Sequence, residues 1–258
     1  MPAADDLRLL IDAAQEAGRI ATSYSGPEAQ AWHKPEGAGP VTEADLAVND
    51  MLERELRAAR PDYGWLSEES LDGRDRLAAD KVFIVDPIDG TRSFIDGART
   101  WAHALAVAEK GEVTAAVIYL PLRDMLYSAV RGQGATLNGN PIRPATRDRL
   151  TGANLLVARP VMEPRHWKNG APNVFRSYRP SLAYRLALVA EGRYDAMLTI
   201  RPTWEWDVAA GDLILREAGA VTSDRIGAPL RFNNADPRVK GVVAANAAVH
   251  RDICAALA

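Results

Sequence analysis

The chain has 258 residues, of which 47% are hydrophobic and 25% charged, and its formal net charge is −3. This composition excludes an intrinsically disordered protein, and the lack of a basic excess argues against a duplex nucleic acid as partner. The single cysteine, Cys254, excludes an intrachain disulfide. The sequence shows neither a signal peptide nor an apolar run of about eighteen residues, so we expect a cytoplasmic protein without a membrane span.

The first part of the chain is predicted to hold two helices separated by a loop. Apolar residues at helical spacing predict a helix over residues 5–24. A second helix is expected to start at Thr42 or Asp45, either of which would cap it, and to end at Pro61. The segment 25–40 between them is polar and rich in Gly and Pro, so we expect a mobile loop.

The middle of the chain alternates short apolar runs with turn residues such as Gly111 and Pro121. This pattern is typical of a meander of antiparallel strands. The strands expected here cover residues 82–85, 103–108, 115–119 and 125–130.

Strands and helices alternate after a Pro- and Arg-rich stretch at 141–153, which predicts an α/β layer. We therefore predict an α+β domain over residues 1–145 and an α/β domain over residues 146–258. The elements expected in the second half are strands at 155–158, 196–200 and 240–244, helices at 182–191 and 207–218, and a final helix.

The strongest local signal is the hexapeptide DPIDGT at residues 86–91, directly after the apolar run. Two carboxylates three residues apart at the end of a strand repel each other, and a divalent cation would relieve that repulsion. Gly90 lets the backbone approach a ligand, and Gly90 and Thr91 offer N–H groups to an anion at a helix start. An ordinary turn is the alternative interpretation.

Three further acidic motifs contain Asp45, the pair Glu68-Glu69, and Asp207 after Trp206. Taken singly, an Asp at a helix start is usually a cap and adjacent glutamates are usually surface charges. Taken together, oxygen ligands without His or Cys favour magnesium, manganese or calcium over zinc. The spacing of an EF-hand is absent. The four histidines show no ligand spacing, so we interpret them as structural or surface residues.

These motifs resemble those of the inositol monophosphatase superfamily of metal-dependent phosphatases. The matching segments occur in family order over most of the chain. They are Val41-Thr42-x-x-Asp45, Glu68-Glu69-Ser70, the hexapeptide 86–91, and Trp206-Asp207-x-Ala209-Ala210-Gly211. The resemblance implies a layered α-β-α-β-α sandwich, as in the inositol monophosphatase and fructose-1,6-bisphosphatase fold, and a homodimer.

The resemblance also implies two or three magnesium ions, with manganese as a substitute and lithium as an inhibitor. Glu68, Asp86 and the Ile88 carbonyl would hold one ion, and Asp86, Asp89 and Asp207 a second. Glu68 would also help to hold a third, weaker ion. Two such ions stabilise charge on both the attacking and the leaving oxygen of a phosphoryl transfer, so no protein nucleophile is needed.

Catalytic roles follow from the same resemblance. Asp45 and Thr91 would orient and activate the attacking water, assisted by Glu68. Asp89 and the backbone of Gly90 and Thr91 would bind the phosphate. The substrate would be a small phosphorylated metabolite.

The substrate itself is less well marked. Inositol phosphatases carry a Glu where this chain has Thr199 or Ile200, which argues against inositol phosphate. Segments 181–192 and 201–207 are similar to the bisphosphate nucleotidases, which act on adenosine 3′,5′-bisphosphate. The side chains expected to contact the substrate are Lys34, Arg185, Arg201 and Glu205.

Other interpretations stay open. Residues 91–97, followed by Trp101, resemble histidinol phosphatases, and a broad inositol or sugar phosphatase is a further alternative. Trp204 and Trp206 either face a base or pack in the interior. From a different class, some superfamily members act as binding proteins with RNA polymerase or the ribosome.

Overall fold

The structure, a computed structural model, describes residues 2–24, 30–33 and 39–258. Lys34 and most of the predicted loop lie outside the described residues. Two long helices, α1 (Pro2–Ser23) and α2 (Glu43–Ala59), form the first layer. A capping box starts α2, in which the Thr42 hydroxyl accepts from the Asp45 N–H and the Asp45 carboxylate accepts from the Thr42 N–H. The predicted cap is therefore confirmed at Thr42.

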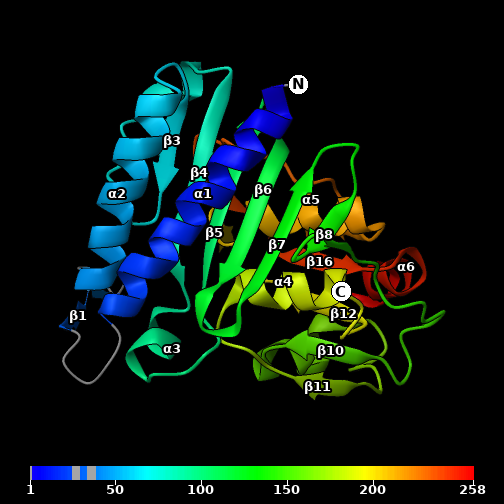
Figure 1. Cartoon of the computed structure of the whole chain (residues 1–258). Helices are drawn as coiled ribbons and strands as arrows, with labels where there is room; N and C mark the ends of the chain where they lie inside the picture. Colours follow the sequence, from blue (N-terminus) through cyan, green and yellow to red (C-terminus); the bar gives the residue numbers. More distant parts are fainter. Residues whose placement is uncertain (1, 25–29, 34–38) are drawn as a thin grey trace.

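The second layer is a seven-stranded sheet, covered on one face by α1 and α2 (Figure 1). The strand order is β3-β4-β5-β6-β7-β8-β9, and only the pair β3–β4 is parallel. The predicted antiparallel meander is therefore confirmed. The strands are β3 (Gly64–Ser67), β4 (Lys81–Asp89), β5 (Ala102–Glu109), β6 (Glu112–Leu120), β7 (Met125–Val130), β8 (Ala135–Leu137) and β9 (Asn140–Pro141).

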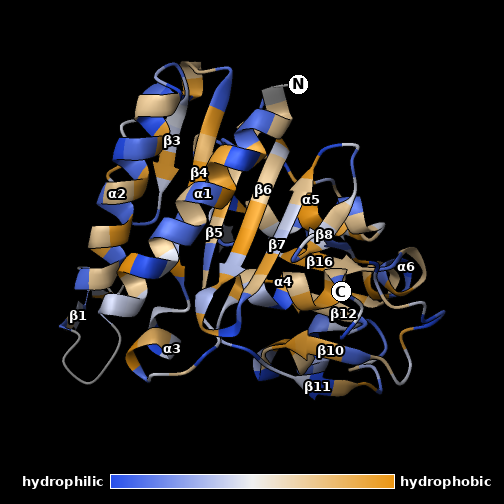
Figure 2. Ribbon diagram, in the orientation of Figure 1, coloured by the Kyte–Doolittle hydropathy of each residue, from blue (hydrophilic) through white to orange (hydrophobic). Residues whose placement is uncertain are grey.

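Two buried helices, α4 (Leu182–Ala190) and α5 (Ala209–Ala218), form the third layer. Both pack between the seven-stranded sheet and a second, five-stranded sheet. Every residue of α4 is buried, which agrees with its nearly unbroken apolar sequence. Figure 2 shows the same distribution, with hydrophobic residues along β4, β6 and α4 and hydrophilic residues on the outer sides of α1 and α2.

The fourth layer is a mixed five-stranded sheet in the order β11-β10-β12-β16-β14, and the fifth is α6 (Ala247–Ala256). The predicted α-β-α-β-α sandwich is confirmed. The strands are β10 (Asn154–Val157), β11 (Phe175–Ser177), β12 (Ala196–Thr199), β14 (Val221–Ser223) and β16 (Val242–Ala245).

Short elements complete the described chain. Two strand pairs lie apart from the large sheets, β1 (Ala31–His33) with β2 (Pro40–Thr42), and β13 (Thr203–Trp204) with β15 (Arg238–Val239). None of the helices in the described part of the chain is long and apolar enough to cross a bilayer. The remaining helices are α3 (Thr91–Ile95) and the 3-10 turns η2 (Asp75–Ala78), η3 (Pro121–Arg123), η4 (Arg159–Met162) and η5 (Pro164–His166).

Two boundaries differ from the sequence prediction. The strand predicted to end at Val85 continues through Asp89. Helix α5 begins at Ala209 with Val208 at its N-cap, so Asp207 lies before the helix and does not cap it. The predicted domain boundary falls between the two large sheets, but one hydrophobic cluster contains residues of both. The division into two domains stays a prediction.

Candidate metal centre

An irregularity in β4 brings two acids to one side of the strand. Residues three apart in a regular strand point to opposite faces. The pairing of β4 with β5 shifts between Asp86 and Asp89, and Pro87 lies in this interval. Proline cannot donate a ladder hydrogen bond and is typical of such bulges, which redirect side chains. The shift therefore allows Asp86 and Asp89 to face the same ligand.

A third acid completes a cluster. Asp86, Asp89 and Asp207 each offer a carboxylate oxygen, and these oxygens lie within 4.8 Å of one another. Asp86 and Asp89 are buried, whereas Asp207 is partly open to solvent. The structure thus joins acids that are separated by more than a hundred residues in the sequence.

Within this cluster, the Asp86 carboxylate gives the clearest indication of a cation site. It is 1% exposed, and among the described residues neither of its oxygens has a hydrogen-bond partner. Burial raises the pKa of Asp86 well above its usual value, and the nearby charges of Glu68, Asp89 and Asp207 raise it further. A buried carboxylate is costly unless it is paired. A hard divalent cation would supply the missing charge, so the acids fit such an ion.

Asp89 makes a second set of contacts, to the start of α4. Its carboxylate accepts from the Ser181 hydroxyl at 2.6 Å and from the backbone N–H groups of Leu182 at 3.1 Å and Ala183 at 2.6 Å. Burial raises the pKa of Asp89, and these donors oppose the shift. Sequence analysis did not predict Ser181, although a Ser directly before a helical pattern is a known cap signal.

Gly90 separates the acids from α3 and adopts a φ of 97°, a left-handed conformation that glycine accepts at little cost. A Cβ atom on Gly90 would lie 3.3 Å from the Ser181 Cβ, so α4 approaches this turn closely. The first N–H groups of a helix have no intrahelical acceptor. At the start of α3 these groups are available to an anion next to the acids.

Asp45 and Thr91 meet beside the acidic cluster. The Thr91 hydroxyl lies 3.3 Å from Asp45 Oδ1 and 3.3 Å from the Ile88 carbonyl oxygen. The Thr42 hydroxyl donates to Asp45 Oδ2 at 2.5 Å, so Asp45 is both part of a helix cap and a partner of Thr91. Glu68 lies near enough that its charge raises the pKa of Asp86 and of Asp207.

The model of the inositol monophosphatase family matches residues 4–258. The chain belongs to the inositol monophosphatase family. An inositol-1-monophosphatase of Mesorhizobium japonicum is 34% identical over 97% of this chain and 95% of its own length. The Nus factor SuhB of Escherichia coli (strain K12) is 36% identical over 86% of this chain and 85% of its own.

Solved structures of relatives share the fold. The extragenic suppressor protein SuhB from Bartonella henselae has a TM-score of 0.80 and 30% identity, covering 97% of both chains. The IMPase of Thermotoga maritima has a TM-score of 0.82 and 27% identity, covering 97% of this chain and 96% of its own. Family membership supports phosphatase activity.

Two of the four predicted substrate contacts line the same cavity. Arg185 and Arg201 border a space of about 300 Å³ with the apolar side chains of Leu198 and Ile200. Both arginines act on the cluster, since their charges lower the pKa of Asp207 against the effect of burial. Arg185 is buried, and its guanidinium lies 4.7 Å from the ring centre of Tyr178.

The prediction that Glu205 contacts the substrate is not supported by its surroundings. Glu205 is fully buried, and its carboxylate accepts hydrogen bonds from Asn233 and Asn234. These bonds leave its oxygens committed to a neighbouring turn. Lys34, the fourth predicted contact, lies outside the described residues, and the structure does not place it.

The structure also shows the surroundings of Trp204, Trp206 and His103. The rings of Trp204 and Trp206 stack at 4.7 Å and 9°, with the Arg238 guanidinium 5.2 Å from the Trp204 ring centre. Trp204 is exposed and Trp206 partly buried, so the pair stacks at the surface and does not pack in the interior. His103 is buried on β5, next to β4, and its Nδ1 contacts the Pro87 carbonyl oxygen. Burial lowers the pKa of His103 to about 4, so it is neutral at pH 7.

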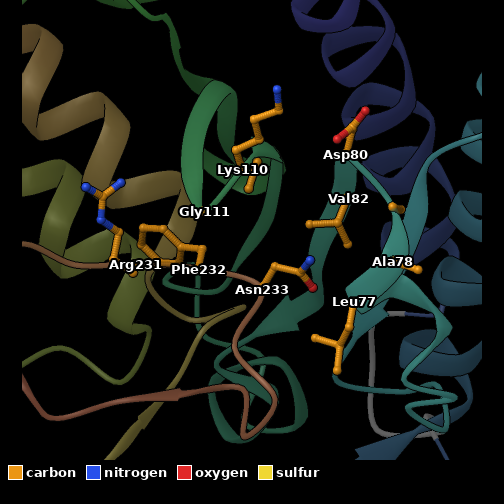
Figure 3. Close-up of a pocket in the computed structure, with 11 residues that line it drawn as sticks. Leu77, Ala78, Asp80, Val82, Lys110, Gly111, Arg231, Phe232 and Asn233 are labelled. Atoms are coloured by element: carbon orange, nitrogen blue, oxygen red, sulfur yellow. The ribbon is translucent and has the colours of Figure 1, made fainter.

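A larger cavity, of about 490 Å³, lies at the other end of β4 (Figure 3). Its lining includes Asp80, Val82, Lys110 and Asn233, drawn from the start of β4, the turn after β5 and a turn in the second half of the chain. It contains only one acid and none of the family motifs. The 300 Å³ cavity also has no acid among the described residues of its lining, but the charges of Arg185 and Arg201, which border it, act on Asp207. It is therefore the better candidate for substrate.

Proposed function

We propose that the protein is a magnesium-dependent phosphomonoester hydrolase that acts on a small phosphorylated metabolite. The observation that carries this proposal is the buried Asp86 carboxylate, unpaired among the described residues and facing Asp89 and Asp207. Such an arrangement is unfavourable without cations. Two or three magnesium ions would neutralise these carboxylates. We expect manganese to replace magnesium and lithium to inhibit the enzyme.

Each acid then has a role toward the ions. Glu68, Asp86 and the Ile88 carbonyl would hold one ion, Asp86, Asp89 and Asp207 a second, and Glu68 a weaker third. When bound, the ions supply positive charge for the phosphoryl oxygens and lower the pKa of the attacking water. Asp89 also connects the ions to α4, because its carboxylate accepts from the first N–H groups of that helix.

Asp45 and Thr91 handle the water and its proton. The Thr91 hydroxyl donates to Asp45 Oδ1, which leaves its lone pair free to orient a water next to the acids. The attacking water would pass a proton to the Thr91 oxygen as the Thr91 hydroxyl passes its own proton to Asp45, which is the general base. The N–H groups of Gly90 and Thr91 hold the phosphate in line with the water.

Adenosine 3′,5′-bisphosphate is the leading substrate within this proposal. A nucleoside bisphosphate carries a second phosphate for Arg185 and Arg201, and guanidinium groups suit such groups. Apolar side chains of the same 300 Å³ cavity, Leu198 and Ile200 among them, suit a base better than a polyol. Inositol-1-phosphate, histidinol phosphate and sugar phosphates are the alternatives, of which the first is favoured by the names of the Mesorhizobium and Thermotoga relatives.

The test is phosphate release with magnesium from adenosine 3′,5′-bisphosphate, inositol 1-phosphate, histidinol phosphate and fructose 1,6-bisphosphate. Asp89→Asn serves as the blank. We expect the bisphosphate to be preferred, and Arg201→Ala to raise its KM at least about tenfold, the value of one charged hydrogen bond. Arg165→Ala, on an exposed surface pair, is the matched control. Equal KM values in Arg201→Ala and wild type would remove the bisphosphate assignment.

A binding function is the second candidate, favoured by the 36% identity to the Nus factor SuhB of Escherichia coli. No turnover of any substrate with magnesium or manganese would bring it forward. Asp89→Asn should not affect such a function. We also keep as proposals the cytoplasmic location and the homodimer, the latter to be tested by light scattering.

A further inference from the structure

Glu205 is a buried charge two residues before Asp207. Its Oε2 accepts from the Asn233 N–H at 2.6 Å. Its Oε1 accepts from the Asn234 N–H at 2.9 Å and from the Asn234 side-chain amide at 2.6 Å. A buried carboxylate with three donors is strongly held in place. The segment that carries Asp207 is thus tied to the 233–234 turn.

The same turn is tied to the other half of the molecule through Arg76. This residue is 1% exposed and follows β3 in the chain. Its guanidinium donates to the Asn233 side chain at 2.6 Å and to the Asn234 carbonyl at 3.0 Å. Its backbone carbonyl accepts from the Asn233 side-chain amide at 3.1 Å. Both ends of the turn are therefore fixed to the 64–89 region.

The Arg76 side chain is itself held by Asp72 and by packing on β3. Asp72 accepts from its guanidinium twice, at 2.9 and 2.7 Å. A Cβ atom on Gly64, the first residue of β3, would lie 2.8 Å from the Arg76 Cβ, so Arg76 packs directly on this strand. Strand β3 leads to Glu68, and its neighbour β4 leads to Asp86. The contacts thus begin on the strands that carry the other acids.

The segment 204–207 is also restrained locally. The Glu205 carbonyl accepts from the N–H groups of Val208 and Ala209, which join the segment to the start of α5. The Glu205 N–H donates to the Pro237 carbonyl at 2.9 Å. The stacked rings of Trp204 and Trp206 flank it. The backbone and the side chain of Glu205 therefore both restrain the segment that carries Asp207.

We propose that Glu205 is a positioning residue for Asp207: through the 233–234 turn and Arg76, it sets the distance between Asp207 and the acids at the ends of β3 and β4. The metal centre takes ligands from two halves of the chain, and the Glu205 contacts span the same two halves. Without them, the second ion would lose affinity because Asp207 is no longer held opposite Asp86. The inference rests on the metal site of the proposed function and is independent of the substrate.

The test is the dissociation constant for Mn²⁺, measured without substrate from the electron paramagnetic resonance signal of the free ion. Glu205→Gln keeps the shape but replaces one acceptor oxygen with an amide group that cannot accept. We expect it to weaken the second ion about tenfold, the worth of one buried hydrogen bond. Asn234→Ala removes one of the three donors and should weaken that ion about threefold.

Glu191→Gln is the matched control, because Glu191 is a largely buried glutamate at the C-cap of α4 that pairs with Arg193. It should lower the melting temperature and leave both Mn²⁺ constants within about twofold. Equal constants in Glu205→Gln, Glu191→Gln and wild type would show that Glu205 only stabilises the fold, and would overturn the proposal. If Glu205→Gln does not fold, an unchanged constant in Asn234→Ala overturns it. A wild type that binds no Mn²⁺ would instead refute the metal site itself.

Discussion

Two buried aspartates near opposite ends of β4 have equal exposure and opposite surroundings. Asp6, on α1, and Asp86 are each 1% exposed. Asp6 accepts from Arg60 at 3.0 Å, from Lys81 at 3.2 Å and from the Tyr63 hydroxyl at 3.0 Å. Asp86 has neither a cation nor a donor among the described residues.

The difference separates a structural acid, Asp6 of α1 against the start of β4, from a candidate metal ligand, Asp86 within β4. Where the chain itself provides cations, a buried carboxylate joins elements, in this case α1, the end of α2 and the start of β4. Where the chain provides only further acids, the carboxylates raise one another's pKa and the charge must come from outside. The four predictions below test this contrast in order of expected effect.

Asp86→Asn should have the largest effect, on activity. We expect phosphatase activity to fall on the order of 10³-fold or more, about 4 kcal/mol of transition-state stabilisation. The metal-free variant should nevertheless melt a few degrees higher than wild type, by roughly 2–5 °C, because it lacks a buried charge. The raised pKa of Asp86 means that the folded state binds a proton at this group more readily than the unfolded state, so the destabilisation that the Asp86 charge causes in metal-free wild type becomes smaller as pH falls.

Calorimetry with and without magnesium measures both parts of this prediction. Magnesium should raise the melting temperature of wild type and not that of the variant. A metal-free variant less stable than wild type would mean that Asp86 is paired within the chain, and the contrast with Asp6 would be lost.

Asp6→Asn should act on stability alone. We expect a loss of about 2–3 kcal/mol in urea unfolding, somewhat less than the 3–5 kcal/mol of fully buried pairs. The reason is that Arg60 and Lys81 keep 30% and 16% of their side chains in water. The magnesium concentration for half-maximal activity should not change. A shift in that concentration would show that the two ends of β4 are coupled.

His103→Gln should change the pH dependence of stability. An unfolded histidine takes up a proton below about pH 6.5, whereas His103 does so only near pH 4. Stability is therefore lost as pH falls through this window. Between pH 7 and pH 5, wild type should lose about 2 kcal/mol more than the variant. Urea unfolding in EDTA at both pH values measures this, and parallel losses would contradict it.

Asp212→Asn should have the smallest effect. Asp212 on α5 is buried, with Arg216 at 3.0 Å as its cation and the Thr222 hydroxyl as a donor. Burial raises the pKa of Asp212 more than Arg216 lowers it, so its charge adds little stability. We expect a loss below about 1 kcal/mol in urea. A loss as large as that of Asp6→Asn would show that the number of cationic partners does not determine how much stability a buried carboxylate contributes.

The parts of the fold that could be predicted depend on neighbours in sequence. The capping box of α2 joins Thr42 and Asp45, three residues apart, and the strands of the meander follow one another with short turns. Strands β13 and β15 were not predicted, because two residues carry no periodicity and the strands pair across more than thirty residues.

The residues of the site likewise fall into those that local motifs predict and those whose contacts no local pattern marks. The acids could be named from motifs, and the structure brings Asp86, Asp89 and Asp207 together. The surroundings of Glu205 could not be predicted, because Asn233 lies 28 residues further on and no local pattern marks the pair. The helix start was misplaced at Asp207, since an acid before an apolar run is also the usual signal of a cap.

The division of the acids between two halves also has a consequence during synthesis. Asp207 follows Asp89 by 118 residues. A ribosome adding about 5–20 residues per second needs roughly 6–24 s for this interval. Throughout it, the nascent chain contains Asp86 and Asp89 but not their third partner. In the proposed metal site, capture of the second ion would therefore be one of the last events in the maturation of this chain, and a fragment released early would lack it.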